Sequence, residues 1–121
     1  KSFPNFIQAN SNLGAVLNKN KRYEEAIPYL KKTVQLDPEF GMAHYNLGNA
    51  YFGVKELKKA KASLEKASNL GIEFVALHWK LYEIHKESGD IEHARKELNF
   101  ILEIDPENEE AKQKLMQEKG A

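Results

Sequence analysis

The chain has 121 residues, carries 18 basic and 18 acidic side chains, and contains no cysteine. Its zero net charge argues against a general attraction to nucleic acid or to anionic membranes. The lack of cysteine excludes a disulfide framework, a thiolate nucleophile and a cysteine-based zinc site. With 41% hydrophobic and 30% charged residues, the composition is typical of a folded protein rather than a disordered one.

Targeting signals are not found in the sequence. No apolar run approaches the roughly 20 residues that a membrane-spanning helix needs, and no basic-then-apolar leader opens the chain. We therefore expect no membrane insertion and a cytoplasmic location. The chain begins with Lys1 rather than methionine and its last residues, 116–121, stop in the middle of a helical pattern. We expect it to be a fragment of a longer protein.

Several columns of residues recur at intervals of 34 along the chain. One column holds leucine four times, at Leu13, Leu47, Leu81 and Leu115. Two more columns keep the same interval, with Ala26, Ala60, Ala94 in one and Leu30, Leu64, Leu98 in the other. Agreement among independent columns indicates an internal repeat. The sequence thus predicts three blocks, 7–40, 41–74 and 75–108.

Each block contains two apolar runs at helical spacing, separated by a short polar turn. Asp90 is a suitable N-cap after such a turn, and Pro38 and Pro106 stand at two of the block junctions, where proline stops a helix. At the middle junction, Gly71 is suited to a left-handed helix end. The expected helices run near 5–19, 22–36, 40–53, 56–70, 74–87, 90–104 and 108–119, the last being a polar capping helix.

Small residues are expected where paired helices approach to about 8–10 Å. Gly14, Gly48 and the alanines of the repeating column occupy these positions. Leu13, Val16 and Leu17 are assigned to the core in the first block. Because no single block can bury its own apolar face, neighbouring blocks are expected to share a continuous core.

The second block, with Leu47-Gly48, Tyr51, Ala60, Leu64 and Ala67, resembles the tetratricopeptide repeat. The first block is similar through Leu13-Gly14, Leu17, Ala26, Leu30 and Pro38, and the third more loosely through Leu81, Ala94, Leu98 and Pro106. The third block departs from the family pattern at Tyr82 and His85, and Ile72 replaces the middle proline. The chain is identified as a single domain over 1–121, with three repeats and a C-terminal capping helix. The resemblance implies an all-α, right-handed superhelical solenoid of antiparallel helix pairs.

The resemblance also implies that the first helices line a concave groove, which in the family commonly binds a peptide. The groove face carries aromatic rings, which bury apolar side chains, beside amides, which donate to and accept from a peptide backbone. The predicted peptide-binding residues are Gln8, Asn12, Met42, Tyr45, Asn46, Asn49, Trp79, Lys80 and Glu83. In an alternative interpretation, Tyr45 and Trp79 pack between adjacent blocks and the asparagines are only solvated.

The leading functional hypothesis is a scaffold for protein–protein interaction. A second hypothesis is a structural module that packs on other repeats or self-associates through its ends, because residues 1–74 hold eleven cations and seven anions while residues 75–108 hold four and eight. A third is a co-chaperone that clamps the terminal carboxylate of a chaperone tail. The resemblance assigns that clamp to Ser11, Ala15, Asn46, Ala76 and Lys80, where only Asn46 fits and Lys80 matches in part.

The histidines give no indication of catalysis. His78 and His85 are seven residues apart, about 10 Å along a helix, too far to share a metal unaided. His44 and His78 fall at a helix-packing position, and His93 is expected to be exposed. No nucleophile–base arrangement, phosphate loop or carboxylate pair stands out. We expect no enzyme activity, no metal, no cofactor and no nucleic acid partner.

Overall fold

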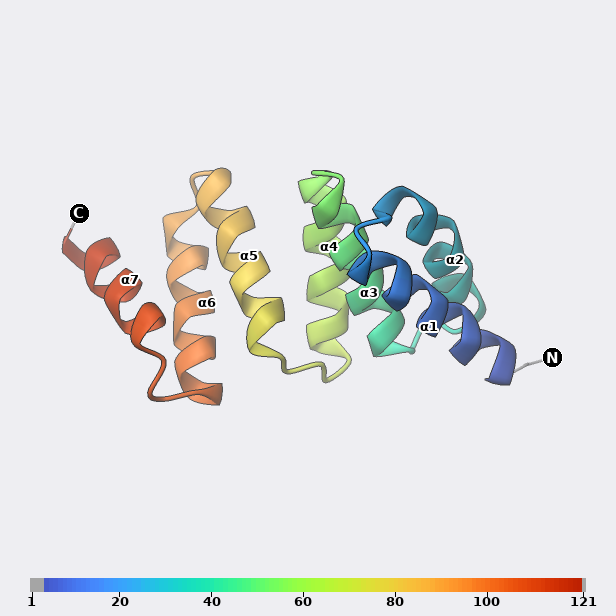
Figure 1. Cartoon of the computed structure of the whole chain (residues 1–121). Helices are drawn as coiled ribbons and strands as arrows, with labels where there is room; N and C mark the ends of the chain where they lie inside the picture. Colours follow the sequence, from blue (N-terminus) through green and yellow to red (C-terminus); the bar gives the residue numbers. More distant parts are fainter. Residues whose placement is uncertain (1–3, 121) are drawn as a thin grey trace. The chain divides into compact units, whose positions relative to one another are not determined.

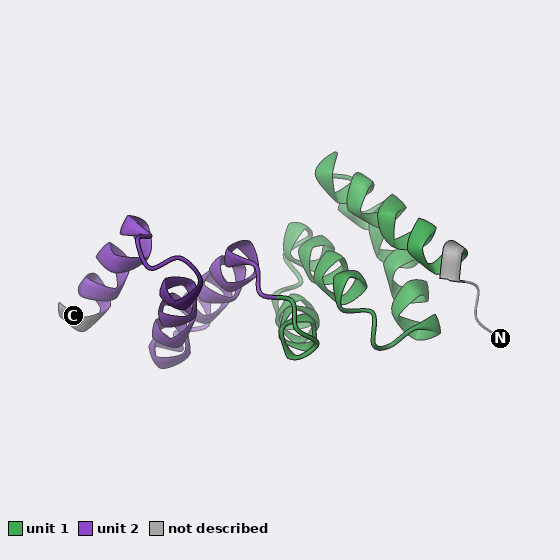
Figure 2. Ribbon diagram, turned by 90° about the horizontal axis from the view of Figure 1, so that it is seen from below, with its two compact units in different colours: residues 1–72 green, residues 73–121 purple. Residues whose placement is uncertain are grey.

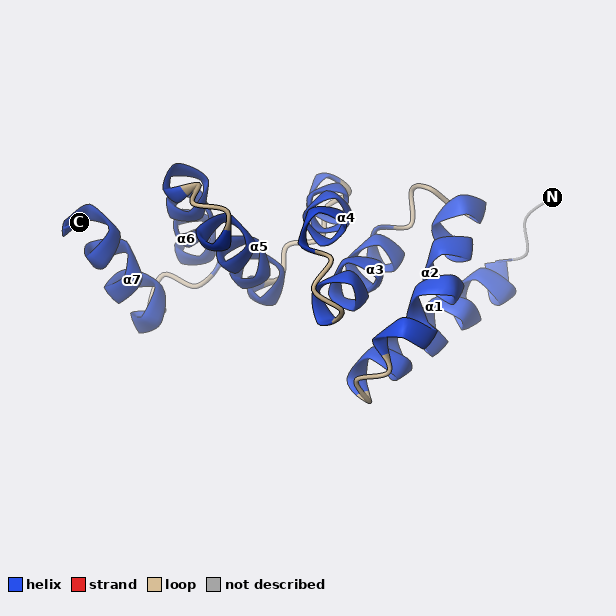
Figure 3. Cartoon of the chain, turned by 90° about the horizontal axis from the view of Figure 1, so that it is seen from above, coloured by secondary structure: helices blue, strands red, loops and turns tan. Residues whose placement is uncertain are grey.

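The protein is described from a computed structural model, which places residues 4–120 and the side chains of residues 6–118. Helices and short turns account for all of the described residues, without a strand among them (Figure 3). The all-α class is therefore confirmed. The helices in chain order are α1 (Pro4–Lys19), α2 (Tyr23–Leu36), α3 (Gly41–Gly53), α4 (Leu57–Asn69), α5 (Val75–Glu87), α6 (Ile91–Ile104) and α7 (Glu109–Gly120) (Figure 1). Every predicted helix is present, with its ends close to those expected.

The chain divides into two compact units, residues 1–72 and residues 73–121 (Figure 2). In the first unit, α1 packs against α2, α3 packs against α4, and α3 also contacts both α1 and α2. In the second unit, α6 lies between α5 and α7 and contacts both. The predicted pairing of successive helices is confirmed within each unit.

The turn inside each helix pair is closed in the same way by main-chain hydrogen bonds. The residue at its centre has a positive φ: 61° at Lys21, 65° at Lys55 and 80° at Gly89. The amide of the next residue donates to the carbonyl five positions earlier, the bond that closes a Schellman motif. These bonds are Arg22 N to Leu17 O (2.8 Å), Glu56 N to Tyr51 O (2.9 Å) and Asp90 N to His85 O (2.9 Å). One backbone geometry thus recurs at the repeat interval, at two lysines and a glycine.

Other helix ends follow their predicted chemistry. Gly71 has φ 98°, and the amide of Ile72 donates to the carbonyl of Ala67 at 3.0 Å, so the predicted left-handed end of α4 is confirmed. The Oδ1 of Asp90 accepts from the amide of His93 at 3.1 Å, which confirms the N-cap of α6. Capping of this kind satisfies an amide that has no partner within its own helix.

The core of the first unit depends on small residues at the helix contacts. A Cβ atom at Gly14 would lie 2.5 Å from the Leu30 side chain, and one at Gly48 would lie 2.7 Å from Cγ of Leu64. Both leucines are completely buried. The glycines therefore allow each first helix to approach its partner closely, as predicted.

The assignment of Leu13 and Val16 to the core is wrong. Leu13 is 40% exposed and Val16 is 53% exposed. Their counterparts one repeat later, Leu47 and Ala50, are buried, and they lie on α3, which α2 contacts from the preceding helix pair. No described helix precedes α1 to cover the same face there.

The second unit has its own cluster of buried side chains. Tyr82, Ala94, Leu98, Ile101 and Ala111 form it, from α5, α6 and α7. Val75, Trp79, Leu102 and Leu115 are partly buried and pack against this cluster. Helix α7 thus covers the end of the unit with Ala111 and Leu115, as expected of a capping helix, while its remaining side chains are largely polar.

Candidate functional site

In the first unit, the predicted residues of α1 and α3 lie on two helices that contact each other. Gln8 and Asn12 are exposed on α1, and Nε2 of Gln8 donates to Oδ1 of Asn12 at 3.0 Å. On α3, Met42 and Tyr45 are partly exposed. The arrangement places a pre-ordered amide pair on one helix and a thioether and a phenol ring on its neighbour.

The predicted exposure of Asn46 is wrong. Its side chain is only 7% exposed, and Nδ2 points to Oγ of Ser11, itself buried, at 3.5 Å. The carbonyl of Asn46 also accepts from Nδ2 of Asn18 at 2.9 Å. Asn46 therefore lies in the contact between α1 and α3 and links these helices, which explains why a polar residue is tolerated at a buried position.

Asn49, one turn beyond Tyr45, is partly buried. Its Oδ1 atom is shielded from solvent and accepts no hydrogen bond from any part of the chain that the structure describes. A buried acceptor without a donor is unfavourable, so Asn49 costs the fold stability at this position.

In the second unit, the predicted residues of α5 are divided between the core and the surface. Trp79 packs against the buried cluster, and its ring meets that of Tyr82 edge-on at 5.6 Å between centroids. Lys80 is partly buried, and burial lowers its pKa although the nearby Glu83 opposes this effect. Glu83 is exposed. Trp79 is therefore partly buried by packing, as in the alternative interpretation, and the residues that it packs against belong to its own unit.

A buried polar cluster in the second unit includes a residue that sequence reasoning missed. Nδ1 of His78 lies 2.8 Å from Oε1 of Glu97, and Nε2 of His85 lies 3.7 Å from Oε2 of the same carboxylate. Both histidines are 2% exposed. His78 fulfils its predicted packing role, but Glu97 was not singled out. The signal was present, because Ala94, Glu97 and Ile101 recur at the spacing of one buried helix face.

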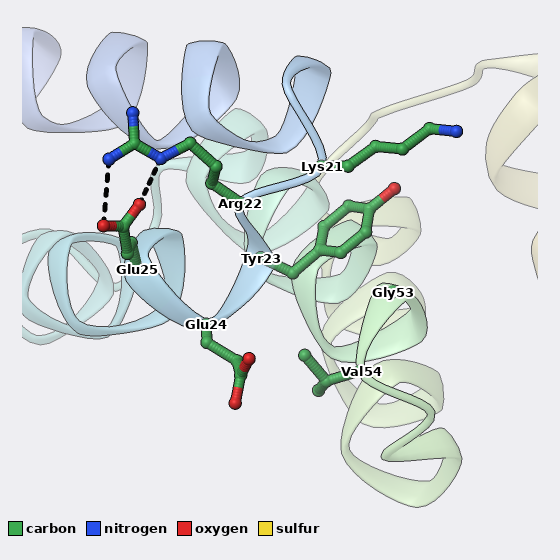
Figure 4. A pocket seen from close by; sticks show the side chains of 7 residues that line it. All are labelled: Lys21, Arg22, Tyr23, Glu24, Glu25, Gly53 and Val54. Atoms are coloured by element: carbon green, nitrogen blue, oxygen red, sulfur yellow. Dashed lines mark hydrogen bonds and ion pairs between the residues drawn. The ribbon is translucent and has the colours of Figure 1, made fainter.

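Figure 4 shows a cavity of about 520 Å³ in the first unit, where α2 begins and α3 ends. The guanidinium of Arg22 forms a two-bond ion pair with Glu25, one bond being 2.9 Å from Nη2 to Oε1. The ring of Tyr23 covers Gly53, where a Cβ atom would lie 2.4 Å from it. Arg22 and Glu25 neutralise each other, and Lys21 and Glu24 add one charge of each sign, so the cavity offers no clear preference for the charge of a ligand.

Two classes of site can be assessed across residues 4–120. No cluster of three or more histidine, aspartate and glutamate side chains there is arranged to hold a metal ion. Of the helices placed in that range, none has the length and apolar character needed to cross a membrane.

Known proteins place these helix pairs in a family. A family model described as tetratricopeptide repeat matches residues 17–71. The crystal structure of YrrB, described as a TPR protein with an unusual peptide-binding site, is 25% identical with a TM-score of 0.79, over 88% of this chain and 55% of its own. The chain belongs to the tetratricopeptide repeat (TPR) family.

Further solved structures resemble this TPR chain. MamA from Desulfovibrio magneticus RS-1, residues 41 to the end, is 31% identical with a TM-score of 0.75, over 88% of this chain and 60% of its own. The first TPR of Spaghetti (RPAP3), bound to HSP90 peptide SRMEEVD, is 23% identical with a TM-score of 0.83, over 96% of this chain and 92% of its own, and shows the fold alone. The TPR chain thus spans 60% of MamA and 55% of YrrB. Curated proteins gave no match.

Proposed function

We propose that the chain binds a short peptide or partner helix in a groove lined by the first helices of its repeats, and does so without catalysing a reaction. TPR domains are generally protein-interaction scaffolds, and two of the solved relatives are described with a peptide or a peptide-binding site. The observation that carries the proposal is the exposed Gln8–Asn12 pair on α1, beside partly exposed Met42 and Tyr45 on α3.

The chemistry of these four residues suits an extended peptide. The hydrogen bond from Gln8 to Asn12 leaves the Oε1 acceptor of Gln8 and the Nδ2 donors of Asn12 for a peptide backbone. A tyrosine ring and a methionine thioether bury an apolar side chain while adapting to its shape.

The predicted residues of α5 are considered in the second unit by itself. There Lys80 and Glu83 provide charges for complementary groups, and the part of the Trp79 ring outside the core provides apolar surface. A small groove with few charged contacts supports binding at about the micromolar level, because immobilising a flexible peptide offsets much of the contact energy.

A carboxylate clamp is not expected from these residues. Ser11 and Asn46 are buried against each other, and Ala15 and Ala76 carry no charge, so Lys80 is the single cation among the five clamp positions. A clamp needs convergent positive charge. We expect the HSP90 peptide SRMEEVD to bind the chain no more tightly than the same peptide with an amidated C-terminus, by fluorescence anisotropy. A strong preference for the free carboxylate would support the co-chaperone hypothesis instead.

The proposal is tested by selecting from a displayed library of random seven-residue peptides. Peptides chosen by the wild-type chain are measured by isothermal titration against Tyr45→Ala and Asn12→Ala. Matched controls are Tyr29→Ala and Asn69→Ala, which remove the same side chains from exposed positions on second helices. We expect each groove variant to weaken binding about tenfold while the controls change it by less than about twofold.

Two results would contradict this proposal. In the first, no peptide is selected, and the chain instead self-associates in a salt-dependent manner in analytical ultracentrifugation, as the structural-module hypothesis expects. In the second, the control variants lose as much affinity as the groove variants, which would place the peptide elsewhere. Circular dichroism of every variant establishes that the helices remain folded.

A further inference from the structure

A second cavity of the first unit lies among α2, α3 and α4 and has a volume of about 510 Å³. We call it the lysine cavity. Its lining residues are Lys31, Val34, Gln35, His44, Leu47, Tyr51, Lys59, Ala62, Ser63 and Lys66. On each helix these residues lie three, four or seven positions after the first of them, so each helix contributes one face to the cavity.

The lysine cavity is separate from the groove residues on the same helix. At 3.6 residues per turn, Leu47 and Tyr51 are rotated by about 200–240° around α3 from Tyr45. The two faces therefore point to nearly opposite sides of the helix. A ligand in the lysine cavity would not touch Tyr45, and the two proposals stand on different residues.

The interior of the cavity is apolar. Leu47 is 5% exposed and Tyr51 is 8% exposed, and Val34 is partly exposed beside them. Nε2 of His44 lies 2.8 Å from the carbonyl of Pro38, which fixes the imidazole. The site is a shallow depression that is open to solvent, so it can receive one apolar side chain of a ligand rather than enclose the whole ligand.

The rim of the cavity is positive. Three of the ten lining residues are lysines, and none is acidic. Nζ of Lys59 lies 5.7 Å from the centre of the Tyr51 ring and 3.2 Å from Oε2 of Glu56, an exposed pair of little strength. Within the described part of the chain, Lys31 and Lys66 form no ion pair.

We propose that the lysine cavity binds an acidic peptide segment that carries one large apolar side chain. The apolar side chain enters among Val34, Leu47 and Tyr51 and is removed from water there. Aspartate or glutamate residues on either side of it reach the lysine ammonium groups at the rim. A nucleic acid is a poorer match, since Tyr51 is only 8% exposed and offers little ring face on which a base could stack.

The test uses a fluorescein-labelled pentapeptide with a central phenylalanine and two acidic residues on each side, blocked at both ends. Its binding to the full chain is followed by fluorescence anisotropy. Two comparison peptides replace the phenylalanine by glycine or the four acids by glutamine. We expect both replacements to weaken binding about tenfold, because the site requires the apolar and the acidic groups together.

Variants locate the site on the chain. The double variant Lys31→Glu with Lys66→Glu reverses the charge of the rim, and Ala62→Phe fills the cavity without changing any charge. The matched control is Lys32→Glu with Lys58→Glu, on the same two helices but outside the cavity. We expect about tenfold weaker binding for the first two and less than about a twofold change for the control.

Four results would overturn the proposal. If the glycine peptide binds as tightly as the phenylalanine peptide, binding is due to general charge attraction and not to the apolar interior. An equal loss of affinity in the control variant would show that the peptide binds outside the cavity. Unchanged affinity for Ala62→Phe would show the same. A ten-nucleotide single-stranded DNA that binds more tightly than the peptide, in competition, would assign the surface to another class of ligand. Loss of binding with Tyr45→Ala, in contrast, concerns only the groove.

Discussion

His78 and Glu97 form a 2.8 Å hydrogen bond inside the second unit, with 3% and 10% of their side chains exposed. On the other side of the imidazole, Nε2 lies 3.6 Å from Oε2 of the exposed Glu73, and Phe100 stacks on the ring. Burial lowers the pKa of His78, but the hydrogen bonds and charges of Glu97 and Glu73 outweigh burial and raise it above the ordinary value of 6.5. The folded unit therefore binds a proton at His78 more tightly than the unfolded chain does.

This linkage predicts a pH-dependent stability. Because the folded pKa of His78 is the higher one, its contribution is complete below the unfolded value of about 6.5 and is lost as the pH rises through the folded value. We expect the urea midpoint, followed by the fluorescence of Trp79, to fall as the pH rises above about 6.5. The variant His78→Gln should flatten this dependence. An unchanged slope in that variant would show that other groups cause it.

Removing the carboxylate of Glu97 should lower the stability of the second unit more than removing an exposed carboxylate does. Glu97→Ala leaves the Nδ1 atom of His78 buried without its partner, and a loss of about 1–3 kcal/mol is expected for such a group. Glu92→Ala, an exposed acid on the same helix, is the control and should change stability by less than about 0.5 kcal/mol. Urea unfolding at a fixed pH of about 6, where the imidazole is largely protonated, measures both. Similar losses in the two variants would contradict the structural role of Glu97.

Gly48→Ala should destabilise the first unit. The new Cβ atom would lie 2.7 Å from Cγ and 3.2 Å from the backbone nitrogen of Leu64, which cannot move away because it is completely buried. Overpacking of this kind costs about 1–3 kcal/mol, against a gain in helix propensity of about 1 kcal/mol. Thermal unfolding followed by circular dichroism, with Lys58→Ala as the control, measures the difference. A higher melting temperature for Gly48→Ala would show that the helices can separate without cost.

Lys55→Gly should stabilise the chain slightly. Lys55 has φ 65°, a conformation that disfavours side chains with a Cβ atom, while the equivalent residue in the third repeat is already Gly89. Relief of this strain, less the greater freedom of glycine in the unfolded chain, gives up to about 1 kcal/mol. The reverse change, Gly89→Lys, should destabilise by a similar amount. Chemical denaturation of both variants provides the check, and shifts of the same sign would refute the explanation.

Trp79→Ala should lower the stability of the second unit. The ring of Trp79 packs on the buried cluster of that unit. We expect a loss of about 1–3 kcal/mol for Trp79→Ala, below the value of about 3–5 for a completely buried tryptophan. Circular dichroism measures it, since the variant lacks the only tryptophan. A stable Trp79→Ala variant that had lost its peptide would assign the ring to binding alone.

The helices could be predicted from the sequence because the repeat superimposes three copies of each helix signal. A proline at Pro38, a left-handed end at Gly71 and an N-cap at Asp90 each mark a boundary through local chemistry, and the structure places the boundaries close to them. Local signals of this kind depend on the backbone of a few neighbouring residues. They need no knowledge of how the helices pack.

The candidate site was predicted less well because exposure depends on the neighbouring helices. Asn46 and Asn12 occupy equivalent positions of two repeats. Asn46 is buried in the contact with α1, whereas no helix pair precedes Asn12 within the described residues. Val16 and Ala50 differ in the same way. Val16 is exposed, whereas its counterpart Ala50 is buried on α3, which α2 contacts. Glu97 was missed for another reason. Its structural role is the hydrogen bond with His78, nineteen positions earlier, and the local sequence around Glu97 does not show that contact.

The Schellman closure of the hairpins has a practical consequence for studying motion. Main-chain bonds define these turns, so the outward side chains of Asn20 and Glu87 can be exchanged without removing a bond that holds the helix ends. The chain has no native thiol, and Asn20→Cys with Glu87→Cys would accept two dyes, one on each compact unit. Energy transfer between the dyes would then report whether an added peptide changes the distance between positions 20 and 87 in solution.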